Sequence, residues 1–362
     1  MSLTQEPILE ALRPIQDPCL DRSIVDLGFV QNLHIDHGTV SFDLVLTTPA
    51  CPVKDQFKEQ CERALESLDG VNEVKVALLA DTRSANTGDR KVLPNVKNVI
   101  AIASGKGGVA KSTTAVNIAV ALRQAGASVG LLDADIYGPS IPTMIEMEVE
   151  PVGTSDERLI PAEGLGVKII SMGYFLPPGQ AAILRGPMVS GYISQFLTSV
   201  EWGELDYLII DYPPGTGDVQ LTLSQDAAVT AAVLCTTPQD IALVDVVKAV
   251  KAFETTKVPV LGVVETMSYF ICDQCDKRHA IFGSGGGERV AKEAGVPLLG
   301  QIPIDPRVVH SGDNGRPIIL EEPDSPVAKA YREIAGQIAA KISTLNMAHD
   351  GSIEGFSLEW KA

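Results

Sequence analysis

A glycine-rich segment carries the residues with the clearest chemistry. It reads Gly105-Lys106-Gly107-Gly108-Val109-Ala110-Lys111-Ser112-Thr113 and stands between an apolar strand pattern and a helix pattern. Backbone N–H groups of such a loop can surround a phosphate chain, while Lys111 reaches its terminal phosphates and Ser112 can bind magnesium. The segment therefore predicts a site for a nucleoside triphosphate with magnesium.

Ala110 departs from the usual pattern of this loop, G-x-x-x-x-G-K, because it replaces the second glycine. Its methyl group would lie close to the bound phosphates, in a loop that normally leaves no room for one. We expect weaker nucleotide binding and an intact fold.

Acidic residues follow two further apolar runs. Asp133 and Asp135 come after one run, and Asp211 comes after another. A carboxylate beside a phosphate loop can hold magnesium through water or orient the attacking water. Each acid alone would more often cap a helix or form a turn. Together with the loop, they predict a phosphoryl-transfer site.

Cys272 and Cys275 lie two residues apart in a polar insertion. Two thiolates can bind one metal, but a closed tetrahedral site needs four ligands, which a symmetric dimer would supply. The residues alone leave two interpretations open. One is an iron–sulfur cluster, and the other is a zinc ion bound by the four thiolates or by Cys272, Cys275 and His279. A redox disulfide is disfavoured because the pair lies in a predicted loop and not at a helix start.

The elements that must position these residues fall into two regions. After residue 95, near-continuous apolar strands alternate with helical stretches, which predicts an α/β fold with a doubly wound, mainly parallel sheet. In such sheets, ligands bind at the carboxyl ends of the strands, where the loop and the acids stand. The predicted strands are Val99–Ala103, Val129–Leu132, Val167–Ser171, Tyr207–Ile210, Ala231–Leu234, Val260–Val264 and Leu298–Ile302.

A small α+β domain is predicted over residues 1–80. Alternating apolar residues in Val30–Ile35 and Thr39–Leu46 indicate a hairpin, residues 53–68 have helical spacing, and residues 71–78 return to a strand. A polar linker is expected over residues 81–95, followed by the sheet domain with its cysteine insertion over residues 96–345 and a flexible tail over residues 346–362.

Composition excludes several classes of protein. The 46 acidic and 29 basic residues give a net charge of −17, so we expect no nucleic-acid or anionic-membrane surface. No apolar run has the roughly 18 to 20 residues needed to cross a bilayer, and the amino terminus shows no secretion signal. Six irregularly placed cysteines do not indicate a disulfide framework. We expect a cytoplasmic protein.

Taken together, these segments resemble the Mrp/ApbC family of P-loop ATPases with a deviant Walker A loop, which carry iron–sulfur clusters and are related to the MinD and ParA ATPases. The resemblance rests on the loop with Lys106, on residues 133–140 and 211–218, and on Met267-Ser268-Tyr269-Phe270 with the two cysteines, and it spans residues 95 to about 342. Upstream, residues 17–18, 23–28 and 47–52 resemble an iron–sulfur assembly domain.

The resemblance implies roles for the residues of the phosphate loop. Lys106 would reach across a dimer to the partner's nucleotide. Lys111 and Ser112 would contact the phosphates and magnesium, and Thr113 would add a neighbouring phosphate contact.

The resemblance also implies roles for residues outside the loop. Asp135 would be a switch carboxylate near the attacking water, Asp211 the acid near magnesium, and Gly215 a switch glycine near the terminal phosphate. Thr266 stands where the family usually has an asparagine that contacts the adenine ring, and its shorter hydroxyl cannot make both amide hydrogen bonds. We therefore expect relaxed base selectivity.

For Cys272 and Cys275, the resemblance implies a [4Fe-4S] cluster that bridges a homodimer and passes to apo iron–sulfur proteins, with cluster assembly factors as further partners. It also implies slow hydrolysis of ATP in the presence of magnesium. One rival is a MinD-like or ParA-like regulator, which needs a membrane or DNA contact, whereas residues 351–362 contain a single basic residue, Lys361. Another rival is a zinc-bridged dimeric ATPase.

Overall fold

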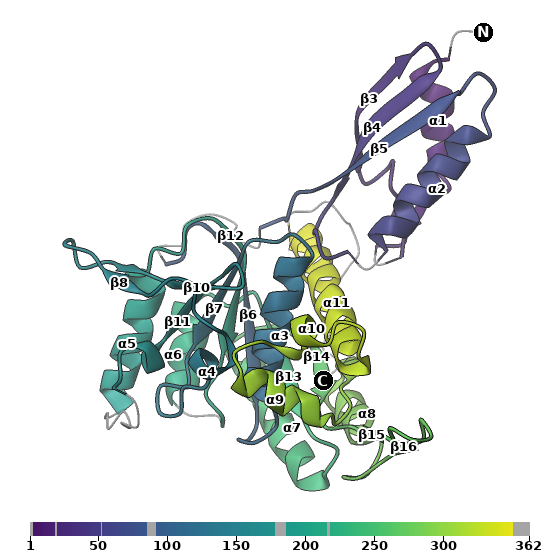
Figure 1. Ribbon diagram of the computed structural model, residues 1–362. Coiled ribbons are helices and arrows are strands. Elements are labelled where there is room, and N and C mark those ends of the chain that lie inside the picture. The colour runs from purple at the N-terminus through teal and green to yellow at the C-terminus, as the bar shows by residue number, and fades with distance from the viewer. Residues whose placement is uncertain are drawn as a thin grey trace. The chain divides into compact units, whose positions relative to one another are not determined.

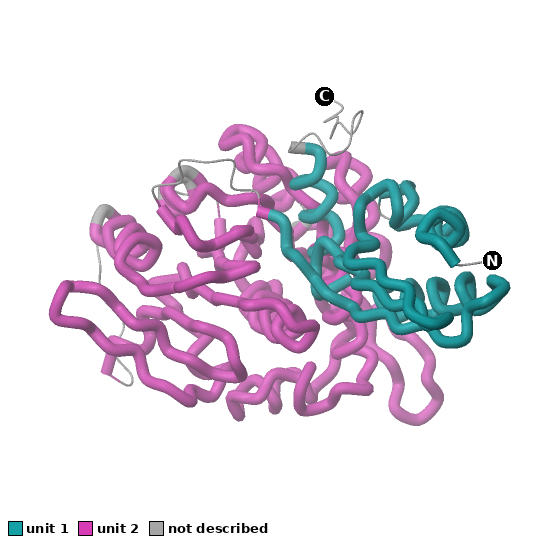
Figure 2. The backbone as a smooth tube through the Cα atoms, turned by 90° about the horizontal axis from the view of Figure 1, so that it is seen from above, with its two compact units in different colours: residues 1–83, 339–354 teal, residues 84–338, 355–362 magenta. Residues whose placement is uncertain are grey.

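The chain forms two compact units (Figure 2). The computed structural model describes residues 3–18, 20–51, 53–84, 92–177, 186–215 and 218–349. Of the described residues, the first unit holds those up to Arg83 and those from Ala339 to His349, and the second holds those from Ser84 to Ile338. Of the predicted linker, residues 85–91 lie outside the described residues. Leu93, near its end, is already buried in the core of the second unit.

The first unit is an α+β fold whose sheet has the order β3-β4-β5. β3 and β4 pair antiparallel, which confirms the predicted hairpin, while β4 and β5 run parallel. The residues of β4 alternate between buried and half-buried, and α2 buries Phe57, Cys61 and Leu65 at helical spacing. The elements are α1 (Gln5–Leu12), β1 (Gln16–Asp17), β2 (Arg22–Ser23), β3 (Val30–Asp36), β4 (Thr39–Leu46), α2 (Lys54–Glu66) and β5 (Glu73–Ala80).

The last helix corrects two predicted boundaries. α11 (Pro326–His349) continues past residue 346, where the flexible tail was predicted to begin. Met347 is buried and belongs to the hydrophobic core of the first unit, and the buried Asn346 donates a hydrogen bond of 2.9 Å to the carbonyl oxygen of Arg83. The division between the units therefore falls inside α11, after Ile338, and not at residue 345. Residues 350–362 of the predicted tail lie outside the described residues.

The second unit is built on a sheet with the order β10-β11-β7-β12-β6-β13-β14-β17 (Figure 1). Every neighbouring pair is parallel except the edge pair β10 and β11. The predicted parallel strands are confirmed. The sheet strands are β6 (Val96–Ser104), β7 (Val129–Asp133), β10 (Ala162–Gly164), β11 (Val167–Ser171), β12 (Leu205–Asp211), β13 (Ala231–Thr236), β14 (Val260–Glu265) and β17 (Leu298–Gln301).

Helices cover both faces of this sheet, as a doubly wound fold requires. One face packs against α5, α6, α7 and α8 in a continuous apolar core, while α3 and the first part of α11 lie on the other face. None of the described helices is long and apolar enough to span a bilayer. The remaining elements of the unit are α3 (Lys111–Gln124), α4 (Ile141–Met144), β8 (Val152–Gly153), β9 (Leu159–Ile160), α5 (Gly186–Thr198), α6 (Asp218–Asp226), α7 (Asp240–Thr255), β15 (Phe270–Ile271), β16 (Arg278–His279), α8 (Gly286–Ala294), α9 (Pro306–Asp313) and α10 (Ile318–Glu321), with a short 3-10 turn at Met172–Tyr174.

Candidate functional site

The phosphate loop joins the end of β6 to the start of α3. Ala110, the residue before the helix, adopts the left-handed conformation with φ 52° and ψ 31°. Gly105 lies so close to α7 that a side chain there would overlap the backbone of Asp245. Gly107 and Gly108 are exposed at the turn of the loop. The loop is therefore held against α7 at its base and open to solvent at Gly107 and Gly108.

Lys111 connects this loop to the end of β12. Its ammonium lies 2.5 Å from Oδ1 of Asp211 and 3.2 Å from the hydroxyl of Ser112. The Lys111 side chain is 7% exposed and that of Asp211 is fully buried. Since β12 and β6 are neighbouring parallel strands, the sheet brings the predicted acid directly beside the predicted lysine. A charge pair removed from water in this way is held by strong, charge-assisted hydrogen bonding.

Asp133 forms a second buried acid beside Asp211. The two residues are register partners at the carboxyl ends of β7 and β12. Asp133 accepts hydrogen bonds from the hydroxyl of Ser171 at 3.0 Å, and from the backbone N–H groups of Ile141 at 3.3 Å and Asp135 at 3.2 Å. Burial, and then the neighbouring charge of Asp211, raise the pKa of Asp133 to about 7. The sequence pattern placed Asp133 among the candidate acids of the phosphoryl-transfer site. It could not show that Asp133 lies beside Asp211, because the register between strands is not visible in one strand.

The acids and Ser112 suit a magnesium ion. Oδ2 of Asp211 is buried and makes no hydrogen bond with the residues that the structure describes. Burial raises the pKa of Asp211, and the ammonium of Lys111 opposes that shift, while the charge of Asp135 nearby adds to it. Magnesium prefers carboxylate and hydroxyl oxygens together with water. An unpartnered carboxylate oxygen next to a serine hydroxyl is therefore a fitting donor set.

Three other predicted residues surround the loop. The N–H of Gly215, whose φ is 98°, donates to the carbonyl of Ser104 at 3.3 Å, so this predicted switch glycine contacts the end of β6, where the loop begins. The next two residues, 216 and 217, lie outside the described residues. Thr266 is buried and its hydroxyl lies 2.9 Å from the carbonyl oxygens of both Val109 and Thr236. The predicted adenine contact of Thr266 stays a prediction, as does the contact of the half-exposed Lys106 with a partner's nucleotide.

The two cysteines lie in the turn of a small hairpin formed by β15 and β16 (Figure 1). The N–H of Cys272 donates to the carbonyl of Lys277 at 3.0 Å, which closes the turn. Backbone N–H of Gln274, the thiol of Cys275 and then its backbone N–H lower the pKa of the Cys272 thiol. Cys272 is half-buried and Cys275 is exposed. A thiol stabilised as thiolate at an open turn is suited to bind metal.

One described chain does not complete a metal site. Among residues 3–349, apart from the short gaps outside the description, no three histidine, cysteine, aspartate or glutamate side chains converge on a point that could hold a metal ion. His279, the third ligand of one zinc alternative, pairs through its backbone with Phe270 and does not complete such a group. The described residues therefore offer Cys272 and Cys275 no third such ligand.

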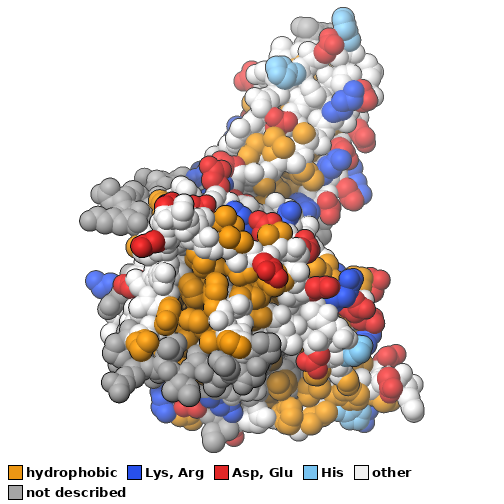
Figure 3. Space-filling view, turned by 60° about the vertical axis from the view of Figure 1, so that its left-hand side comes forward, with side chains coloured by type: hydrophobic (Ala, Val, Ile, Leu, Met, Phe, Trp, Pro, Cys, Tyr) orange, Lys and Arg blue, Asp and Glu red, His pale blue; other side chains and the backbone are white. Residues whose placement is uncertain are grey.

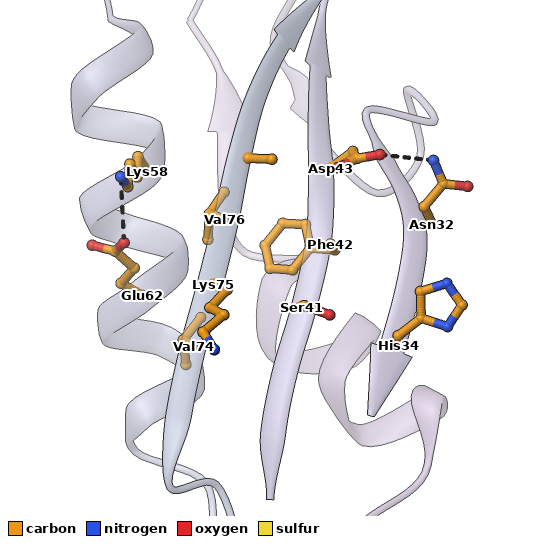
Figure 4. A pocket seen from close by; sticks show the side chains of 11 residues that line it. Asn32, His34, Ser41, Phe42, Asp43, Lys58, Glu62, Val74, Lys75 and Val76 are labelled. Carbon is orange, nitrogen blue, oxygen red and sulfur yellow. Dashed lines mark hydrogen bonds and ion pairs between the residues drawn. The ribbon is translucent and has the colours of Figure 1, made fainter. Parts of the chain in front are cut away.

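A hollow of about 570 Å³ lies in the first unit, between the strands β3, β4 and β5 and helix α2 (Figure 4). Four of its polar side chains form two pairs: Asn32 donates to Asp43 at 2.7 Å, and Lys58 lies 4.0 Å from Glu62. These four groups are therefore already occupied with one another.

The phosphate loop at the carboxyl edge of a parallel sheet, with a lysine and two acids converging behind it, defines a P-loop nucleoside triphosphatase. A family model described as a NUBPL iron-transfer P-loop NTPase of the ParA group matches residues 95–339, and a model for iron–sulfur cluster assembly proteins matches residues 5–77. The chain belongs to this iron-transfer P-loop NTPase family. These matches confirm the resemblance seen in both regions of the sequence.

Similar proteins cover nearly the whole chain. An iron–sulfur cluster carrier protein of Synechocystis is 51% identical over 94% of this chain and 98% of its own length. The carrier protein of Escherichia coli strain K12 is 41% identical over 91% of this chain and 90% of its own. Among solved structures, a nucleotide-binding protein from Archaeoglobus fulgidus in complex with ADP is 38% identical, covers 66% of this chain and 93% of that chain, and has a TM-score of 0.58.

Proposed function

We propose that the protein is an ATP-dependent iron–sulfur cluster carrier, which binds a [4Fe-4S] cluster between two copies of the chain and passes it to apo-proteins. The observation that carries the proposal is the hairpin of Cys272 and Cys275, where backbone N–H groups stabilise a half-exposed thiolate. Family membership and the carrier names of relatives over 40% identical support the same function.

The hairpin supports a shared cluster for reasons of stoichiometry. Each chain offers two sulfur ligands, whereas a cubane cluster takes four cysteine thiolates. Two chains related by a two-fold axis would bring together Cys272 and Cys275 from each. Ile281 and Phe282, which follow the hairpin, are 55% and 41% exposed, and Figure 3 shows apolar side chains gathered on one face of the second unit. Exposed apolar surface of this kind is typical of protein contacts.

The phosphate loop would supply the nucleotide dependence. ATP binding exchanges the present partner of Lys111: the ammonium, now paired with Asp211 at 2.5 Å, turns to the terminal phosphates. Magnesium held by the hydroxyl of Ser112 and by Oδ2 of Asp211 would neutralise phosphate charge. Asp135, whose charge acts on Asp211, would orient an attacking water, and Lys106 would complete the site in a second subunit. Thr113 and Gly215 would add contacts near the phosphates.

A cluster-transfer assay tests the proposal. The reconstituted protein is mixed with an apo-enzyme that needs a [4Fe-4S] cluster, and recovered enzyme activity is followed with and without Mg-ATP. We expect transfer from the wild type, an effect of ATP on its rate, and no transfer from Cys272→Ser. Asp273→Ser alters a neighbouring exposed residue of the same turn and should transfer normally. Equal transfer by Cys272→Ser and the wild type would refute the proposed role of the hairpin.

A further inference from the structure

Glu265, the last residue of β14, holds the base of the cysteine hairpin. Its side chain is fully buried, and both carboxylate oxygens accept hydrogen bonds. Oε1 accepts from the hydroxyl of Ser268 and from Nε2 of Gln301 at 3.0 Å, while Oε2 accepts from the backbone N–H of Gly287. A buried carboxylate is tolerated only when it is hydrogen-bonded in this way.

Two of the three donors to Glu265 come from the two ends of the insertion that carries the cysteines. Ser268 precedes Cys272 by four residues, and Gly287 follows Cys275 by twelve. The chain turns back at Met267, whose φ of 51° is in the left-handed region, and this turn brings Ser268 onto the carboxylate. Both ends of the insertion therefore contact the same buried carboxylate, that of Glu265.

The glycines after the hairpin allow this close approach. A side chain at Gly286 would overlap the carbonyl of Pro238, and a Cβ at Gly287 would lie 2.9 Å from Oε2 of Glu265. The first turn of α8 is thus pressed against the end of β14, with its N–H group directed at the carboxylate. Negative charge at a helix N-terminus is a favourable arrangement.

The next residue, Thr266, contacts the phosphate loop. Its hydroxyl lies 2.9 Å from the carbonyl oxygen of Val109, the residue before Ala110, and its backbone N–H donates to Thr236 at 2.7 Å. Two consecutive residues at the end of one strand therefore bind the nucleotide loop and the base of the hairpin. Within the insertion, the side chain that takes part in this connection is the hydroxyl of Ser268.

We infer that Glu265 and Thr266 are positioning residues that transmit the state of the phosphate loop to Cys272 and Cys275. A shift of Val109 on nucleotide binding moves Thr266, and the adjacent Glu265 moves both ends of the hairpin with it. The inference rests on the proposed function, since it gives the nucleotide a route by which to change cluster binding. A series of contacts such as this shows communication only when the coupling between the phosphate loop and the cysteines is measured.

The test measures the reactivity of the two thiols in the full-length, reduced, cluster-free protein. Alkylation of Cys272 and Cys275 by iodoacetamide is timed by peptide mass spectrometry, with no nucleotide and with Mg-ADP at a concentration shown by titration to saturate each variant. For the wild type we expect Mg-ADP to change the alkylation rate by about fivefold or more, the lower end of ordinary allosteric coupling. Substitution of a residue with a merely structural role would change the alkylation rate by the same factor with and without Mg-ADP.

The variants separate the two possibilities. Thr266→Val keeps the shape but removes the hydroxyl, and should reduce the response to less than about twofold, whereas Thr266→Ser should keep it. Ser268→Ala, a milder change at the other end of the route, should also reduce the response. Ser284→Ala is the matched control, because Ser284 is exposed in the same insertion and should respond as the wild type does.

Two results would overturn the inference. One is a wild type whose alkylation rate does not change with Mg-ADP, and the other is a change as large as that of the wild type in both Thr266→Val and Ser268→Ala. Neither result depends on a cluster. Iron analysis of the reconstituted wild type tests the proposed function separately. Absence of iron would count against the carrier function, whereas an unchanged alkylation rate would count against the connection through Glu265 and Thr266.

Discussion

Ala110 has a backbone conformation that usually belongs to glycine, and Ala110→Gly tests what this costs. With φ 52° and ψ 31°, the residue is left-handed, which costs an ordinary L-residue about 1–2 kcal/mol. Glycine loses about 0.4–1 kcal/mol more than alanine in chain entropy on folding. The difference predicts that Ala110→Gly stabilises the nucleotide-free protein by about 0.5–1 kcal/mol, and a gain of 1 kcal/mol raises Tm by about 2–4 °C in a unit of this size.

Ala228→Gly is the matched control for this change. Ala228 is also left-handed, with φ 45°, but it precedes β13 at the amino edge of the sheet, away from the phosphate loop. Both variants should raise Tm in thermal unfolding, while only Ala110→Gly should bind Mg-ATP more tightly in a titration, because it alone removes a methyl from the loop. A stabilised Ala228→Gly beside an unchanged Ala110→Gly would refute the strain argument. Equal Mg-ATP affinity of Ala110→Gly and the wild type would refute the steric argument.

Three further changes test other parts of the account. Lys111→Met leaves the buried Asp211 without its cation and should destabilise the protein by about 3–5 kcal/mol in urea unfolding at pH 8; a loss below about 1 kcal/mol would contradict the importance of the pair. Folded Asp133, with its pKa raised from 3.8 to about 7, keeps a proton that the unfolded chain releases, so its contribution to stability falls as pH rises through that window. The Tm of Asp133→Asn relative to the wild type should therefore increase from pH 5 to pH 8, and a constant difference would exclude this titration. Met347→Ala should cost about 2–5 kcal/mol and Met347→Leu less than about 1.5 kcal/mol; equal effects would return residue 347 to a tail.

The strands of the second unit could be predicted because each is a short apolar run buried on both faces. Val167–Ser171 was predicted with the bounds that β11 shows, and the loop and acids were predicted at the correct edge of the sheet. What the sequence could not show is pairing between distant segments. The role of Asp133 depends on the register of β7 against β12, and the burial of Met347 depends on the core of the first unit.

Glu265 shows the same limit in the candidate site. Its three donors stand 3, 22 and 36 residues away, in a turn, a helix start and a strand. In sequence, it is one acid at the end of an apolar run, a position that more often caps a helix or forms a turn. Two glycines of residues 283–287 are required by the close approach of α8 to its neighbours, Gly286 to Pro238 and Gly287 to Glu265, and sequence alone does not show either neighbour.

The central claim is that Cys272 and Cys275 of two chains share one cluster. Its most direct test is the content of iron, acid-labile sulfide and zinc per dimer after anaerobic reconstitution, measured with the oligomeric state in solution. The account predicts about four iron and four sulfide per dimer, and their loss together in the double variant Cys272→Ser, Cys275→Ser. Stoichiometric zinc that iron does not displace, or a full cluster in the double variant, would contradict it.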